Sequence, residues 1–157
     1  MRPAGRCSDA AGTRRCYCLR GILNCSELQE SIRALYAPTN TDIDGFSIGK
    51  RALKNRLLGI LMSLGDASIS QMCQEHYYEA RSMSERLAAL DLLENYAPEL
   101  AHSALADFYD RYKDQTLVMN KYFSVLASSR CDATLQRVIA LQEDPAYDVK
   151  VPNLVRS

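Results

Sequence analysis

The feature that most constrains this chain is a short joint between two amphipathic segments, within residues 77–93. Mostly apolar residues recur at the spacing of one helix face before the joint and again after it: Ile69, Met72, Cys73, His76, Tyr77 and Ala80, then Met83, Leu87, Leu90, Leu93 and Ala97. Between the two faces, Ser82 stands three residues before Glu85, the spacing of a capping box at a helix start. One helix therefore ends and the next begins with almost no linker, which lays the two helices side by side.

Amphipathic segments joined by short connections continue along most of the chain. The spacing predicts seven helices, from Ser26 to about Tyr36, over about 47–64, 68–80, 83–96 and 98–113, from Asp114 or Thr116 to about Leu126, and from Asp132 to near Pro145. A further helix opens at Pro152, and no segment is predicted as a strand. Helices of these lengths are stable only when their apolar sides pack together. We therefore predict an all-α fold, an armadillo- or HEAT-like α-solenoid of stacked antiparallel helix pairs, although no repeat signature recurs at a fixed period.

The inward side of each helix is predicted from its apolar positions. In the helix over 47–64, we expect an apolar side facing inward, formed by Leu53, Leu57, Ile60, Leu61 and Leu64. Its basic side is expected to be largely solvated, with Lys50, Arg51, Lys54 and Arg56. Gly65 suits a left-handed C-terminal cap. In the helix that starts at Asp132, the residues expected to be buried are Leu135, Val138 and Ile139.

The first 25 residues differ from the rest of the chain. They contain five arginines against one acid, Asp9, and no sustained helical period. We predict a disordered or non-native leader over residues 1–25 and a helical domain over residues 26–157. An arginine-rich, acid-poor start also resembles an organelle transit peptide, but serine is scarce there and no amphipathic face appears.

Charge and cysteine usage limit the partners and the compartment. Lysine plus arginine and aspartate plus glutamate number 19 each, so no net charge attracts nucleic acid or an anionic membrane. The longest apolar run, 57–64, is too short to span a bilayer. Of the six cysteines, four lie in the first 25 residues and Cys73 lies on an apolar stripe. We expect free thiols in a reducing compartment, the cytoplasm, with no nucleic-acid or membrane partner.

No residue pattern of a self-sufficient active site is found. His76 and Glu79 match the start of the inverted zinc motif H-x-x-E-H, but Ala80 stands where the second histidine is needed. We interpret His76 as a packed residue. The four cysteines before Ser26 lack the C-x-x-C pairs of zinc ribbons. We therefore predict no catalytic residue and no metal ligand in this chain.

Four stretches, taken in order and at their spacing, carry a resemblance to a known family. They are G-K-R-A-L-K-N-R-L-L-G-I-L, A-R-S-M-S-E-R-L-A-A-L, D-Q-T-L-V-M-N-K-Y-F-S-V-L-A-S-S and V-P-N-L-V-R-S. From about Glu27 to Ser157 the chain resembles the C-terminal helical domain of bacterial-type aminopeptidase N, the alanyl aminopeptidases, which are zinc metallopeptidases.

The resemblance implies a function for the whole enzyme and a role for this part of it. The zinc site, with its H-E-x-x-H motif, belongs to an earlier catalytic domain of the family, and the helical domain closes over that domain to enclose a chamber for peptides. By the same resemblance, Arg156 and Asn153 in the P-N-x-x-R-S segment are substrate-binding candidates. The implied partners are the aminopeptidase catalytic domain, normally in the same chain, and peptide substrates.

The catalytic half of the family and its closing helices find no counterpart in this sequence. We therefore expect a fragment of a zinc-dependent aminopeptidase, inactive alone, that supplies the wall of the substrate chamber. The alternative is a helical-repeat module that binds another protein through its concave face and has no enzymatic activity.

Overall fold

The computed structural model describes residues 30, 41–130 and 134–155, and these residues form helices and their connections, with no strand among them. The helices are α2 Gly45–Met62, α3 Ala67–Glu79, α4 Met83–Tyr96, α5 Pro98–Tyr112, α6 Thr116–Ala127, α7 Thr134–Leu141 and α8 Pro152–Val155. The leader over 1–25 and most of the predicted helix over 26–36 lie outside the described residues, although Glu30 is described and is helical. The predicted all-α fold is confirmed.

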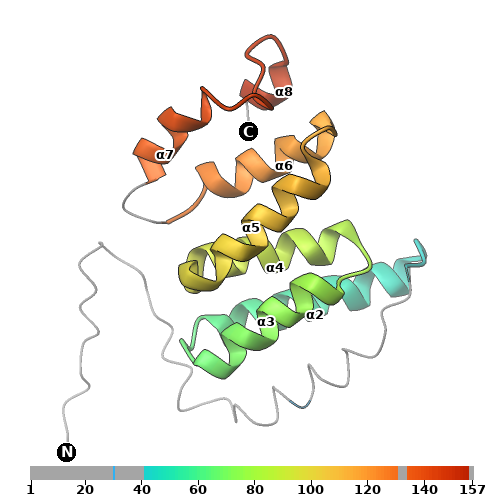
Figure 1. The fold of residues 1–157 in the computed structure, drawn as a ribbon. Helices are drawn as coiled ribbons and strands as arrows, with labels where there is room; N and C mark the ends of the chain where they lie inside the picture. Colours follow the sequence, from blue (N-terminus) through green and yellow to red (C-terminus); the bar gives the residue numbers. More distant parts are fainter. Residues whose placement is uncertain (1–29, 31–40, 131–133, 156–157) are drawn as a thin grey trace, which may run out of the picture.

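The helices stack in chain order into the predicted α-solenoid. Figure 1 shows α2 and α3 at one end, α4 and α5 in the middle, and α6, α7 and α8 at the other end. Helix α4 packs against α2, α3, α5 and α6, so it holds successive layers together. No described helix combines the length and the apolar character that crossing a membrane requires.

The joint between α3 and α4 forms as the sequence predicts. Ser82 is the N-cap of α4, and its hydroxyl accepts a hydrogen bond from the backbone N–H of Glu85 at 3.3 Å. Arg86 then fixes the angle of the joint. Its guanidinium donates to the carbonyl of Ala80, at the end of α3, and to the hydroxyl of Tyr112 on α5, both at 2.6 Å. Because one side chain bridges three helices, the joint is rigid rather than a free linker.

The core follows from the buried sides of α2, α3, α4 and α5. Its fully buried members are Leu58, Leu61, Cys73, Tyr77, Ala89, Leu90, Leu93, Ala101, Ala104 and Phe108. The predicted inward stripe of α3, from Ile69 to Tyr77, is buried as expected, apart from Met72, which is half-buried. After α2, Gly65 adopts a φ of 72°, which confirms the predicted left-handed cap.

The predicted orientation of α2 is only partly right. Leu61 is buried as expected, and Lys50 and Arg56 are exposed as expected. The other buried residues are Arg51, Lys54, Leu58 and Met62, whereas Leu53, predicted to face inward, is 51% exposed. The buried side is thus turned by about one residue position, roughly 100°, from the side with the most leucines. The reason is that the aliphatic stems of Arg51 and Lys54 lie inward and their charged ends find partners there.

The predicted burial in α7 is also wrong for two residues. Leu135 is 68% exposed and Ile139 58% exposed, and Val138 is half-buried. The inward side of α7 instead carries Arg137, which pairs with Glu94 of α4. Helix α6 begins at Thr116, one of its two predicted starts, but neither Asp114 nor Thr116 caps it, because its N-cap is Gln115, which makes no side-chain capping bond. Asp132, the predicted start of α7, lies outside the described residues.

Candidate functional site

The two predicted substrate-binding residues fall at the far end of the helical stack. Asn153 is the second residue of α8 and is exposed, whereas Arg156 lies outside the described residues. The prediction that Pro152 opens a helix is confirmed, because α8 starts there. The structure therefore gives a surface position for Asn153 and leaves the substrate-binding role of both residues a prediction.

A small apolar cluster anchors α8 and so positions Asn153. The next residue, Leu154, is buried against Met119 and Phe123 of α6. The ring of Tyr147 meets that of Phe123 edge to face, with 5.6 Å between centroids. Since one leucine and two aromatic rings carry this contact, α8 is held on α6 as a short surface turn that presents Asn153 outward.

Polar contacts fix the loop between α7 and α8. The hydroxyl of Tyr109 on α5 donates to the carboxylate of Asp144 at 2.9 Å. The same carboxylate accepts from the backbone N–H of Ala146 at 2.8 Å. Accordingly, the hydrogen bond to Asp144 raises the pKa of Tyr109. The loop that leads to Asn153 is therefore fastened to the middle of the stack and not only to α6.

A buried ion pair lies beneath the α3–α4 joint. Lys54 Nζ contacts Glu85 Oε1 at 2.8 Å, with 3% and 1% of the two side chains exposed. The other carboxylate oxygen of Glu85 accepts a hydrogen bond from the Ser82 hydroxyl at 2.9 Å. The expectation that Lys54 belongs to a solvated face is wrong, because Glu85 supplies a counter-charge in the interior.

His76 lies close to this ion pair and is buried, as the sequence predicts. Its pKa is lowered to about 4, chiefly by burial and in smaller part by the Lys54 ammonium, whereas the Glu85 carboxylate acts in the opposite direction. At neutral pH the imidazole is therefore uncharged. Cys73, one helical turn before it on α3, is a free thiol whose pKa burial raises to about 12. Neither group has the accessible, activated form that nucleophilic or acid–base catalysis requires.

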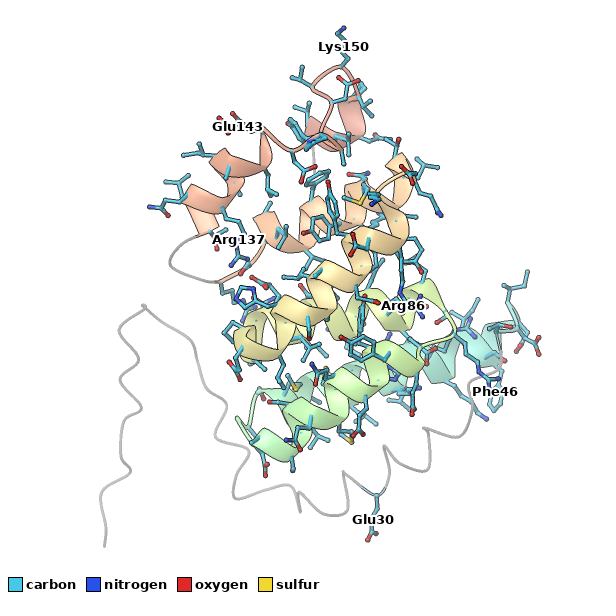
Figure 2. All side chains as sticks on the ribbon, viewed as in Figure 1. Glu30, Phe46, Arg86, Arg137, Glu143 and Lys150 are labelled. Atoms are coloured by element: carbon cyan, nitrogen blue, oxygen red, sulfur yellow. The ribbon has the colours of Figure 1, made fainter. Side chains whose placement is uncertain are left out.

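A second buried carboxylate ties the last helices to α4. Glu94 accepts hydrogen bonds from the hydroxyl of Ser129 at 2.9 Å and from the guanidinium of Arg137. Figure 2 shows Arg137 projecting from α7 toward the rest of the stack. Next to it, Asn95 accepts from the backbone N–H of Arg130 at 3.1 Å. These contacts fix the turn after α6, and with it the direction of α7.

The described residues offer no ready metal site. They contain no group of three or more His, Cys, Asp or Glu side chains that could hold a metal ion. A zinc ion therefore does not fit any set of donors in the part of the chain that the structure describes. What the arrangement does provide is a helical stack with an exposed amide, that of Asn153, at one end.

Sequence reasoning missed both buried ion pairs. A signal was present, because Arg51, Lys54, Leu58 and Leu61 follow one another at helical spacing and so share a side. Glu94 likewise follows Leu87 and Leu90 on the same side of α4. A charged residue within an apolar stripe points to a buried partner, but the sequence does not say which residue of which helix supplies it.

Comparison with known proteins gives a family and several relatives. A family model described as "Domain of unknown function (DUF3458_C) ARM repeats" matches residues 23–157. The chain is similar to Aminopeptidase N of Haemophilus influenzae, with 31% identity over 112 residues that cover 70% of this chain and 12% of that protein. For Aminopeptidase N of Escherichia coli the identity is 25% over 136 residues, covering 84% of this chain and 16% of the other.

A third relative and a solved structure agree with these matches. Aminopeptidase N of Caulobacter vibrioides is 27% identical over 114 residues, which cover 73% of this chain and 13% of that protein. The chain thus spans only 12 to 16% of the length of these three relatives. A crystal structure of Legionella pneumophila aminopeptidase A in complex with aspartic acid has the same fold over 83% of this chain and 16% of its own, with a TM-score of 0.73 and 22% identity. The resemblance inferred from the four sequence stretches is confirmed.

Proposed function

The chain belongs to the family described as a domain of unknown function with ARM repeats, DUF3458_C, and on that premise we propose that it forms part of the helical wall of an aminopeptidase substrate chamber. The enzyme as a whole would remove N-terminal residues from peptides. In this proposal residues 26–157 are the helical domain, residues 1–25 are a leader, and the protein works in the cytoplasm. The free, buried thiol of Cys73 is in keeping with a reducing compartment.

One observation carries the proposal. Three curated relatives from three bacteria share the name Aminopeptidase N, and each aligns with this chain over at least 112 residues. The solenoid fold adds support, because stacked helices form extended surfaces that suit a wall. Asn153 adds a polar group at one end of that surface, held in place by Leu154.

The chemistry is assigned to another part of the enzyme. The described residues contain no donor set for a metal ion, and their buried thiol and imidazole are neutral at pH 7. We propose that zinc belongs to a separate catalytic domain, which is the partner of this wall. The residues of this chain then act by shaping access and contacting the peptide, with Asn153 and Arg156 as the candidates.

The first test uses the 157-residue chain alone. We expect it to release no p-nitroaniline from alanyl p-nitroanilide and to copurify with less than stoichiometric zinc, as measured by elemental analysis. Turnover by the pure chain, abolished by a chelator and restored by zinc, would overturn the proposal. Capture of a defined partner unrelated to aminopeptidases would favour the alternative, a protein-interaction module.

The second test places the chain in a complete enzyme. The matching 136-residue stretch of Escherichia coli aminopeptidase N is replaced by the corresponding residues of this chain. We expect the chimera to hydrolyse alanyl p-nitroanilide, and a chimera with an unrelated helical segment to fail. In the active chimera, Asn153→Ala or Arg156→Ala should raise KM for a peptide by about two- to tenfold with little change in kcat. The matched control is Lys150→Ala, an exposed position three residues before Asn153.

A further inference from the structure

Helix α8 is too short to fix its own orientation. It consists of the four residues Pro152–Val155, of which only Leu154 is buried. Isolated helices of this length do not persist in water, so contacts with the rest of the stack decide where α8 lies. The contact of Leu154 with α6 is apolar and therefore has no preferred direction. A directional contact is needed to set the side toward which Asn153 points.

Asp144 supplies such a contact, in the connection of residues 142–151 between α7 and α8. Its Oδ1 atom accepts two hydrogen bonds, from the hydroxyl of Tyr109 at 2.9 Å and from the backbone N–H of Ala146 at 2.8 Å. The backbone carbonyl of Asp144 accepts from the N–H of Tyr147 at 2.9 Å. One carboxylate oxygen therefore joins α5 to a tight turn over residues 144–147. Because hydrogen bonds weaken steeply when they bend, these bonds fix direction as well as distance.

A second turn connects the turn at Asp144 to α8. Asp148 Oδ1 accepts from the backbone N–H of Lys150 at 2.8 Å, and the carbonyl of Asp148 accepts from the N–H of Val151 at 2.9 Å. Val151 precedes α8, and its carbonyl accepts from the N–H of Leu154 at 3.0 Å. Consecutive turns thus run from residue 144 into α8, so a displacement of Asp144 is passed on to the helix.

The donor to Asp144 stands on the well-packed middle of the stack. Tyr109 follows Phe108, which is fully buried in the core, and its ring lies 5.6 Å from that of Tyr122 on α6. Since the hydrogen bond to Asp144 raises the pKa of Tyr109, the hydroxyl keeps its proton at neutral pH and remains a donor. Asp144 is therefore held in place relative to α5.

We propose that Asp144 is a positioning residue, which holds α8 so that the Asn153 amide meets a main-chain peptide group of the substrate. The inference rests on the proposed function, in which Asn153 contacts the peptide. An asparagine side chain offers an NH2 donor and an oxygen acceptor, which match the C=O and N–H groups of the substrate's main chain. Such pairing requires one orientation of the amide. Asp144 does not touch the substrate and acts through Asn153.

The chimera of Escherichia coli aminopeptidase N that carries this chain provides the first test. Asp144→Ala removes the shared acceptor and should raise KM for a peptide by about two- to fivefold, with little change in kcat. Asp144→Asn keeps an oxygen acceptor and should leave KM close to that of the parent chimera. Tyr109→Phe removes the bond to α5 and should act like Asp144→Ala. The matched control is Tyr78→Phe, at an exposed tyrosine of α3, which should leave KM unchanged.

A double variant separates positioning from a general loosening of the fold. If Asp144 acts through Asn153, Asp144→Ala should add no further increase in KM once Asn153→Ala is present. Equal effects of Asp144→Ala with and without Asn153→Ala would overturn the inference and leave the proposed wall function standing. So would an increase in KM for Asn153→Ala but none for Asp144→Ala. An unchanged KM in Asn153→Ala would remove the substrate role of Asn153, and the positioning role with it.

Amide exchange in the 157-residue chain gives a readout that needs no catalysis. Exchange over residues 152–155 should rise about tenfold in Asp144→Ala and Tyr109→Phe, because α8 loses its directional hold. It should stay unchanged in Asp144→Asn, and exchange over the core of α5 should stay unchanged in all three variants. Unaltered exchange over 152–155 in Asp144→Ala would overturn the inference even if the chimera proves inactive.

Discussion

The middle of the stack and its C-terminal end are held together by different kinds of contact. Helices α3, α4 and α5 share a continuous apolar core whose members include Cys73, Leu90 and Phe108, all fully buried. Helix α7 has no buried residue and α8 has one, Leu154. We infer that most of the folding free energy lies in the middle and that the C-terminal end opens more readily.

Both regions nevertheless use the same polar device, an ion pair to a buried glutamate of α4. Glu85 pairs with Lys54, and both side chains are almost fully buried. Glu94 pairs with Arg137, whose side chain is 28% exposed. The candidate substrate contact, Asn153, lies in the less stable region. Ligand-binding surfaces that adjust their shape are commonly found in regions of low local stability, whereas the α3–α4 joint belongs to the more stable middle of the stack.

The largest expected effect comes from breaking the Lys54–Glu85 pair. Glu85→Ala should lower the free energy of unfolding by about 3–5 kcal/mol, because it leaves the Lys54 ammonium buried without its counter-charge. Urea denaturation followed by circular dichroism measures the change. The double variant Lys54→Met/Glu85→Leu should recover most of the loss, since it replaces both charges by apolar side chains of similar size. A cost below about 1 kcal/mol for Glu85→Ala would mean that the pair is solvated and that the two regions are alike.

The second prediction makes the same truncation in both regions. Leu90→Ala should lower the free energy of unfolding by about 2–5 kcal/mol, because it opens a cavity in the shared core. Leu154→Ala removes an equally buried leucine, but the loss should appear mainly as faster amide exchange over residues 152–155. The global unfolding midpoint should move less, because α8 detaches before the core unfolds. Equal shifts in the midpoint would contradict the inferred difference between the regions.

The third prediction uses pH, which acts on the middle region through His76. Its pKa is lowered to about 4 in the folded protein, by burial first and by Lys54 second, whereas Glu85 acts in the opposite direction. Since the ordinary pKa is 6.5, the unfolded chain binds more protons between pH 6.5 and 4. The contribution of neutral His76 is full above pH 6.5 and is lost as pH falls through this window.

The size of this pH effect follows from the shift. Between pH 7 and pH 5, stability should fall by about 2 kcal/mol more in the wild type than in His76→Gln. Urea denaturation at the two pH values measures it. An identical pH dependence in the two proteins would show that His76 is solvated in the folded state. Residues 134–155 contain no histidine, so this response should not originate in α7 or α8.

The sequence predicts the helices well but two of their orientations badly, and the errors share one cause. The helix order, the Ser82 cap, the Gly65 cap and the inward stripes of α3 to α5 follow from local spacing and turn chemistry. In α2 and α7 the structure turns a basic residue inward, Lys54 in one and Arg137 in the other. Each binds a glutamate of α4 that lies 31 or 43 residues away in the chain. Periodicity within one helix carries no information about such a partner.

The candidate site was predictable only in part. The local sequence was enough to place the start of α8 at Pro152, and the family resemblance singled out Asn153. The contacts that fasten this end were not predictable, because Tyr109 reaches Asp144 from 35 residues away and Leu154 depends on Met119 and Phe123 of α6. Contacts between residues far apart in the chain leave no pattern in the local sequence of the segment that they anchor.

The smallest expected effect comes from breaking the Glu94–Arg137 ion pair at the C-terminal end, which is compared with the Lys54–Glu85 pair beneath the α3–α4 joint. Arg137→Ala should lower the free energy of unfolding by about 1–3 kcal/mol, less than Glu85→Ala, because the Ser129 hydroxyl still serves the Glu94 carboxylate and solvent can reach the space left by the arginine. Amide exchange over 134–141 should rise at the same time, because α7 loses its link to α4. The matched control is Arg111→Ala, which removes an exposed ion pair to Asp107 within α5 and should cost at most about 1 kcal/mol. If Arg137→Ala destabilises the chain as much as Glu85→Ala, the C-terminal end is as firmly built as the joint, and Asn153 sits on a rigid surface rather than an adaptable one.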